Sequence, residues 1–422
     1  AASFSENLAR TLPAAQLTTL AINLLDTIEK DKDARKQRDK QYEEGLKRTG
    51  MGGDAPGGAD FEGASRAVHP MLAEGCVDYA ARAMREIFPS NGPVKTKIYG
   101  DADTKKLERA RRKADYLNWQ LTQQIVEYRP EKEVLLTQLP LGGSQYEKYW
   151  VDFEEHRPRM EFVPIDKVIL PYAAVSFYSA HRMTHVLDVT REAFEARIRS
   201  GFYVDVVNLL SPPAPEETAA ERANDRIEGV EEGDNDNPDG LRCVYEVSAI
   251  MDLVPGEGRA PYVIHLDEDT TRIVAVYRNW KEGDPGKKKL DWWVEYKFIP
   301  WRGAYGIGLP HLIGGLAAAS TGALRALLDA SHISNSPGAV KLKGGRASGQ
   351  NTTIAQTEVK ELDAPAGVDD IRKVIMPMPF NPPSGVLFRL LDWITVQAKG
   401  VVATTEERMD QVGDRTPVGT TM

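Results

Sequence analysis

Residues 296–335 read YKFIPWRGAYGIGLPHLIGGLAAASTGALRALLDASHISN, and this stretch decides the fold. Its first part is strand-like and then carries two turn signals, Pro300 and Gly306-Ile307-Gly308. Its second part is rich in Gly and Ala and predicts a helix over about His311–Ser331, roughly 33 Å long at 1.5 Å per residue. The stretch therefore predicts a strand, a tight turn and a long helix.

Small residues recur at every fourth position of this helix: Gly314, Ala318, Gly322, Ala326 and Ala330. They share one face, and a face of Gly and Ala lets another helix approach closely. Each Gly costs about 1 kcal/mol of helix propensity relative to Ala, so close packing must offset that cost. We expect the stripe to be a packing seam. Periodicity alone leaves open whether the partner helix belongs to the same domain or to another subunit.

A second long helix is expected over about Ser384–Glu407, opened by Asn381-Pro382-Pro383. One face of it is apolar, with Leu387, Leu390, Leu391, Ile394, Ala398, Val401 and Val402. Between the two helices, short strands are predicted at Gly338–Leu342 and Thr357–Leu362. The residues that follow Glu407 are polar and predict a loop.

The preceding chain predicts an α+β body. We expect helices at about 14–48, 66–87, 104–128 and 190–200, the third of them basic at Arg109, Arg111, Arg112 and Lys113. From Val134 the pattern favours strands, and residues 242–301 predict an antiparallel meander. The segment 50–63 is typical of a linker. Ser211–Gly240 is Pro-rich and acidic, with almost no large apolar residues, and is expected to be an exposed insertion or a disordered loop.

Composition narrows the range of possible functions. The net charge is −9 over 422 residues, which argues against a protein that grips nucleic acid over a large surface, but not against DNA passing by. The two cysteines, Cys76 and Cys243, stand far apart and form no CxxC motif. The apolar run Leu309–Leu324 is shorter than the ~20 residues of a membrane span, so no membrane association is expected.

Enzyme motifs are incomplete. His181 and His185 have zincin spacing, but Arg182 stands where the general-base Glu belongs. Residues 234–240 suggest a calcium loop, yet Pro238 occupies a ligand position. We predict no catalytic residue, no metal and no cofactor.

The order of these elements resembles the core of tailed-bacteriophage portal proteins, in particular those of podophages. The similarity rests on loose motifs in the body and at both ends of the first long helix, namely 139–150, 161–168, 180–185, 298–308 and 329–337. Portal proteins are head-to-tail connectors.

The resemblance implies a portal fold with an α/β wing, a two-helix stem and a small β-containing clip. Its parts would be an N-terminal helix and linker (1–63), the wing (64–308), the first stem helix (309–334), the clip (335–382), the second stem helix (383–407) and the channel or tunnel loop (408–422). Family members usually continue into a crown, so we expect the sequence to be part of a longer chain.

The function implied is a dodecameric ring at one capsid vertex of a virion, assembled in the host cytoplasm. Double-stranded DNA would pass through it during packaging and ejection. Expected partners are the terminase large subunit, a tail adaptor, and the major capsid and scaffolding proteins. An alternative is another phage head–tail connector or capsid structural protein; a metal-dependent nuclease is disfavoured because no converging carboxylates are found.

The resemblance also assigns roles to residues. The small-residue stripe would be the seam between subunits of the stem. Channel-facing residues would be Arg389, Lys399, Glu406, Glu407, Arg408 and Arg415. Docking residues of the clip would be Lys341, Lys343 and Arg346.

Overall fold

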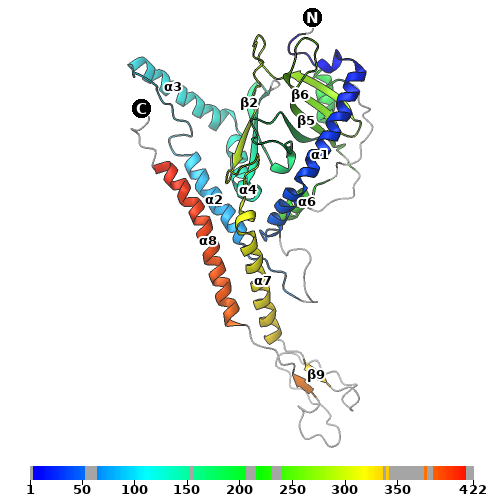
Figure 1. The fold of residues 1–422 in the computed structure, drawn as a ribbon. Helices are drawn as coiled ribbons and strands as arrows, with labels where there is room; N and C mark the ends of the chain where they lie inside the picture. Colours follow the sequence, from blue (N-terminus) through cyan, green and yellow to red (C-terminus); the bar gives the residue numbers. More distant parts are fainter. Residues whose placement is uncertain are drawn as a thin grey trace, which may run out of the picture.

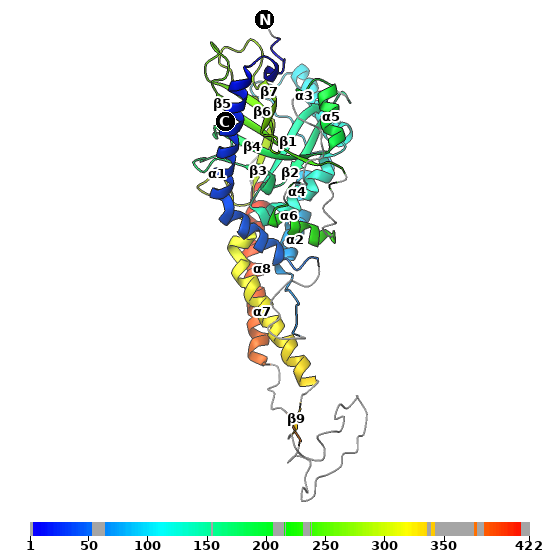
Figure 2. The ribbon, with the colours of Figure 1, turned by 90° about the vertical axis from the view of Figure 1, so that its right-hand side faces the viewer.

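The computed structural model describes residues 3–52, 64–152, 155–205, 215, 217–230, 237, 239–335, 339–341, 375–377 and 384–414. It consists of a mixed helix-and-sheet body from which two long helices, α7 (Leu309–Asn335) and α8 (Gly385–Asp414), extend side by side (Figure 1). The view turned by 90° shows the same division into a body and a narrow two-helix extension (Figure 2). The α+β prediction is confirmed, as are both long helices.

Two antiparallel sheets form the β part of the body. The larger has the strand order β3-β4-β5-β6-β7, and the smaller has the order β2-β1-β8. The strands of the larger sheet are β3 (Val168–Ile169), β4 (Arg182–Val189), β5 (Arg242–Met251), β6 (Ala260–Asp267) and β7 (Arg272–Arg278). Those of the smaller sheet are β1 (Ser144–Asp152), β2 (Arg157–Val163) and β8 (Trp293–Lys297).

The meander prediction holds for β5 to β7 and fails for β8. Strand β8 does not join the larger sheet. It pairs with β1 of the smaller sheet, with Tyr146 opposite Glu295 and Ser144 opposite Lys297. It therefore ties the strand that leads into α7 to the centre of the smaller sheet.

Further helices of the described chain surround the sheets: α1 (Ala14–Lys47), α2 (Met71–Ile87), α3 (Thr104–Trp119), α4 (Tyr128–Gly142), α5 (Arg191–Arg199) and α6 (Ala219–Glu228). The predicted helices over 14–48 and 190–200 are confirmed, and the Thr190 hydroxyl caps α5 by accepting from the Ala193 amide. The predicted helix 104–128 is interrupted by a π-helical turn at Gln120–Gln124, after which α4 begins. Short 3₁₀ turns lie at Leu8–Arg10 and Ile165–Lys167.

Helix α4 corrects the strand predicted from Val134. Leu135, Leu136 and Leu139 recur at helical spacing and are buried, in one cluster with Ala80 and Ala83 of α2. Pro130 lies in the first turn, where a helix needs no amide donor, so it does not oppose the helix.

Helix α6 corrects the expectation of an exposed insertion over 211–240. Thr218 and Glu221 form a capping box at its start. Ala220 and Ala223 are buried in the same cluster as Tyr42 of α1. Two small side chains and the partly buried Ile227 thus suffice to pack this helix against the body.

The body contains two main apolar clusters. One joins the larger sheet to α1, with Tyr245, Val247 and Ile264 against Leu24 and Ile28. The other lies where the two long helices leave the body and is described below.

Candidate functional site

The root of α7 is fixed by a close crossing of two glycine turns. Gly143 has a φ of +73° at the end of α4, and a Cβ on it would lie 2.7 Å from the Gly308 nitrogen. A Cβ on Gly308 would lie 2.5 Å from the Pro140 carbonyl oxygen. The Gly306 amide donates to the Ser144 hydroxyl at 2.7 Å. The crossing requires glycine because any side chain there would overlap backbone.

Arg38 of α1 braces this crossing, and Arg48, the residue that follows α1, holds the start of α7. Arg38 donates to the carbonyl oxygens of Gly142 at 2.7 Å and Gly306 at 3.0 Å. One turn into α7, Arg48 donates to the Gly314 carbonyl oxygen at 3.2 Å. Hydrogen bonds from charged donors are stronger than neutral ones, so α1 holds α7 at a defined position.

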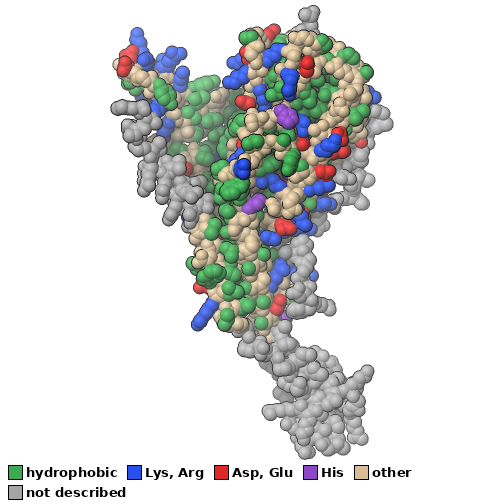
Figure 3. All heavy atoms as spheres, viewed as in Figure 1, with side chains coloured by type: hydrophobic (Ala, Val, Ile, Leu, Met, Phe, Trp, Pro, Cys, Tyr) green, Lys and Arg blue, Asp and Glu red, His purple; other side chains and the backbone are tan. Residues whose placement is uncertain are grey.

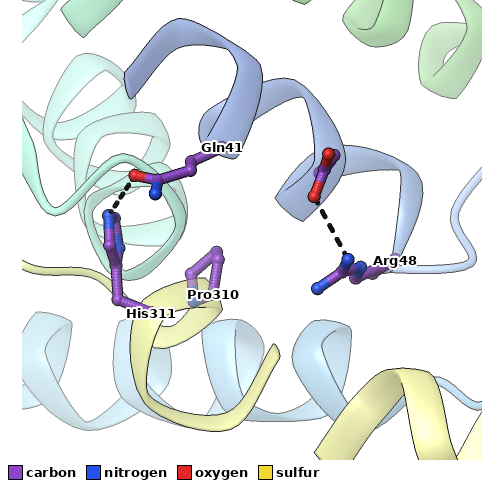
Figure 4. Close-up of a pocket in the computed structure, with 5 residues that line it drawn as sticks. Gln41, Arg48, Pro310 and His311 are labelled. Carbon is purple, nitrogen blue, oxygen red and sulfur yellow. Dashed lines mark hydrogen bonds and ion pairs between the residues drawn. The ribbon is translucent and has the colours of Figure 1, made fainter. Parts of the chain in front are cut away.

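A shallow hollow of about 300 Å³ lies between α1 and α7 at this point. Figure 4 shows Pro310 at its centre, with the Gln41–His311 hydrogen bond (3.1 Å) and the Glu44–Arg48 ion pair (3.1 Å) on either side. The polar groups in the hollow are engaged with one another, so it is part of the α1–α7 contact.

The two long helices share a buried core with the body. Ile313 and Ala317 of α7 lie in one cluster with Ile394 and Ala398 of α8. Gly75 of α2 joins them: a Cβ there would meet Leu309 at 3.1 Å and Val402 at 3.5 Å. We call α7 and α8 together the stem. Its root is thus built from α1, α2, α7 and α8.

The predicted small-residue seam divides into two parts. Gly314 is buried, and a Cβ on it would lie 3.1 Å from the Arg48 guanidinium, so α1 of the same chain occupies its face. Ala318, Gly322 and Ala326 are exposed, and a Cβ on Gly322 would meet nothing within 4 Å. Ala330 is half-buried. The exposed part can accept another helix, and its role between subunits stays a prediction.

The stem also exposes large apolar side chains. On α8, Val386 is 78% exposed, Phe388 66%, Trp393 56% and Val396 59%. The predicted packing face of α8 is correct for Ile394 and Ala398, which are buried, whereas Leu390 and Val401 remain exposed. Leu312 and Leu328 of α7 are exposed as well. Contiguous exposed apolar residues mark an interaction surface in soluble proteins, and apolar side chains are seen along the stem (Figure 3).

The structure places part of the predicted channel-facing set. Arg389 is exposed on α8. Lys399 is 69% exposed on α8 and lies 3.6 Å from the Glu74 carboxylate of α2. Glu406, Glu407 and Arg408 belong to α8, which corrects the helix end predicted at Glu407 and the loop predicted from residue 408. Glu and Arg are strong helix formers, so the helix continues through them without an apolar pattern. Arg415 lies outside the described residues.

The predicted clip is described only at two strands. β9 (Ala339–Lys341) and β10 (Ile375–Pro377) pair antiparallel, with Lys341 opposite Ile375. They lie beyond the far end of the stem from the body (Figure 1). Lys343, Arg346 and the predicted strand Thr357–Leu362 lie outside the described residues.

A buried charged cluster lies between the sheets, and sequence reasoning did not find it. The Lys148 ammonium contacts the Glu246 carboxylate at 2.6 Å, and His265 lies 3.9 Å from the same oxygen. His185 and His265 are the two cross-strand neighbours of Glu246. Burial and the Lys148 charge lower the pKa of His185 to about 3, and burial lowers that of His265 to about 4.

This cluster is sealed within the body. Burial raises the pKa of the Glu246 carboxyl, but the charge and hydrogen bond of Lys148, together with the two neighbouring histidines, outweigh it and lower the pKa to about 2. His185 packs edge-on against Trp293 at 4.9 Å. The side chains of both histidines are almost wholly buried, and the described residues contain no group of three potential metal ligands. We therefore interpret the cluster as structural.

Helix α7 corrects the argument made from length against a membrane span. Its window Leu309–His332 is long and apolar enough to cross a bilayer by length and composition. However, three of its polar side chains bind the segment 65–69: Arg325 donates to the Ala67 carbonyl, Asp329 accepts from Ser65, and Thr321 accepts from His69. These bonds and the buried root favour a helix that packs against protein.

No protein-family model and no curated protein sequence matches the chain.

Proposed function

We propose that this protein is one subunit of a portal-type ring that conducts double-stranded DNA through a capsid vertex. One observation carries the proposal: two long helices extend together from an α/β body and expose apolar side chains that the described chain does not cover. Burial of apolar surface is the main driving force of association, so further copies of the stem are the natural cover.

The positions of the covered and exposed faces of the stem support a ring. The stem is covered by α1 and α2 at its root, and its remaining faces differ from one another: exposed Gly and Ala on α7, large apolar side chains on α8. Two unlike faces form a head-to-tail interface, and such interfaces close into rings when the rotation allows it. In this arrangement Ala318, Gly322 and Ala326 would receive the α8 side chains of a neighbour.

The charge of the chain agrees with a conduit. A net charge of −9 leaves few phosphates neutralised, so DNA could slide past with little counterion release. Arg389 and Lys399 of α8 are both exposed and are the candidates for contact with the DNA. The strand pair β9–β10, beyond the stem, would dock the terminase large subunit during packaging and a tail adaptor afterwards. The body would contact the major capsid and scaffolding proteins.

Electron microscopy of the purified protein tests the proposal. We expect rings with a central hole and a mass of about 560 kDa, twelve times the 46.7 kDa chain. A compact monomer at micromolar concentration would contradict it. A ring whose stem helices lie apart from one another would instead support a different head–tail connector or capsid structural protein.

A further inference from the structure

A second surface lies away from the stem, on the segment 93–124, which we call the arm. It consists of the run Pro93–Asp103, helix α3 and the π-helical turn. No residue of α3 is buried. Figure 1 shows α3 standing out from the body, and Figure 3 shows Lys and Arg side chains gathered on it.

The arm is basic within an acidic protein. It holds eight Lys and Arg residues and four Asp and Glu residues, a net charge of +4 against −9 for the whole chain. The basic residues are Lys95, Lys97, Lys105, Lys106, Arg109, Arg111, Arg112 and Lys113. A basic stripe on one element is the electrostatic footprint of a nucleic-acid contact.

One stripe of α3 combines charge with aromatic rings. Lys105, Arg109, Arg112, Tyr116 and Trp119 follow each other at alternating spacings of four and three, which places them on one face of the helix. All five are exposed. The Tyr116 and Trp119 rings lie 5.8 Å apart at an angle of 35° and are 57% and 49% exposed. The stripe thus runs from cations to an open aromatic pair.

The other side of α3 is already occupied by the arm itself. The Thr96 hydroxyl donates to the Ala110 carbonyl at 3.0 Å. Val94 and Asn118 exchange two hydrogen bonds, of 2.8 and 3.2 Å. Ala110 and Asn118 are half-buried in consequence. Because this side is covered, α3 cannot lay a broad apolar face into a lipid surface, and the basic–aromatic stripe is its most open face.

We propose that the arm binds single-stranded nucleic acid. Phosphates of the strand lie along Lys105, Arg109 and Arg112, and unpaired bases stack on Tyr116 and Trp119. Aromatic side chains beside a basic track are how proteins hold single strands without reading their sequence, whereas duplex DNA keeps its bases stacked on one another. This activity is independent of the ring and does not require the stem.

The test is fluorescence anisotropy with a labelled 20-nucleotide strand and the matching 20-base-pair duplex over a series of salt concentrations. We expect tighter binding of the single strand. Arg109→Ala with Arg112→Ala should weaken binding at least tenfold at low salt and reduce the salt slope by about 1.4, or about 0.7 for each phosphate that is no longer neutralised. Tyr116→Ala and Trp119→Ala should each weaken it about tenfold with the salt slope unchanged.

Lys36→Ala with Lys40→Ala on α1 is the matched control, because it removes two exposed charges from the body. It should leave binding unchanged. Since α3 buries no residue, and Lys36 and Lys40 are exposed, all these variants should keep the unfolding midpoint of the parent protein, which separates a binding defect from a folding defect.

Three results would overturn the proposal. Equal or tighter binding of the duplex would exclude stacking on the aromatic pair. An equal weakening in the arm and control variants would make the binding a non-specific charge effect. A change of assembly mass in the arginine variant, with binding unchanged, would assign the arm to a contact between copies. Failure of this proposal is distinguishable from failure of the ring proposal, because strand binding and ring assembly are measured in separate experiments.

Discussion

Gly306 lies so close to Gly143 that a methyl group on Gly306 would overlap the Gly143 carbonyl oxygen. The contact joins the turn before α7 to the turn after α4. The neighbour is backbone within a hydrogen-bonded crossing, so it cannot move aside as a flexible side chain would. The position of the stem relative to the body thus depends in part on two residues that lack side chains.

Gly306→Ala should lower the free energy of unfolding by about 1–3 kcal/mol, the usual cost of overpacking. Urea unfolding followed by circular dichroism measures it. Gly315→Ala is the control: it lies in α7, is exposed and has open space around it. It should be neutral or stabilise the protein by up to about 1 kcal/mol. Equal effects of the two variants would show that the crossing does not constrain the stem.

Ala318→Leu or Gly322→Leu should prevent ring assembly while leaving the body folded. Both positions are exposed in the single chain, so a leucine meets no obstacle until a neighbouring helix approaches. Mass photometry and electron microscopy report the assembly, and thermal unfolding reports the fold. Ala34→Leu on the exposed face of α1 should assemble like the parent protein. Normal rings from both stem variants would remove this face from the interface.

Lys132→Met should cost about 3–5 kcal/mol of stability, because it leaves the buried Glu147 carboxylate without its cation. The side chains of Lys132 and Glu147 are 3% and 0% exposed, and Tyr149 and Tyr296 donate to Glu147 at 2.8 and 2.9 Å. Adding Glu147→Gln should restore part of the stability, since the amide oxygen still accepts from the tyrosines. A single variant within about 1 kcal/mol of the parent would show that the pair is poorly formed.

Stability should fall as the pH drops from about 6.5 towards 4. In the unfolded chain a histidine gains its proton near pH 6.5, whereas burial holds the pKa of His265 at about 4 and that of His185 at about 3 in the folded protein. At these two positions the unfolded state binds more protons over this window, which favours unfolding in acid, and Glu295, whose pKa burial raises to about 7, opposes part of this effect. Urea midpoints measured between pH 7.5 and 4.5 test this.

His265→Asn should flatten that pH dependence, because one of the two depressed groups is removed. His156→Asn is the matched control, since His156 is exposed. An unchanged slope in His265→Asn would show that His265 already carries its proton in the folded state.

Local patterns predicted the elements whose apolar residues repeat within one helix or strand. Helix α7 is an example, with Ile313 and Ala317 facing the core as periodicity requires. The pairing of β8 with β1 was missed because strand partners far apart in sequence leave no local signal. Helix α4 was missed because Pro140 and Gly142 resemble a strand-ending turn, although Leu135 and Leu139 are buried at helical spacing.

In the candidate site, too, the local patterns were predictable from the sequence and the long-range contacts were not. The Gly and Ala stripe of α7 is visible in the sequence. The contact that covers Gly314 is not, because it comes from Arg48 at the end of α1, more than two hundred residues earlier. Likewise the charge of α3 is plain in the sequence. Its isolation from the body is not, because exposure depends on where the rest of the chain packs.

The stem root also has a bearing on biosynthesis. Helices α1 and α2 emerge from the ribosome early, yet the cluster at the root is completed only by Ile394 and Ala398, which are translated much later. Until then Leu309, Ile313 and Ala317 lack their cover on the α8 side. The nascent chain therefore passes through a period in which its body is nearly complete but carries an open apolar patch, and this is when it is most exposed to aggregation and to chaperone capture.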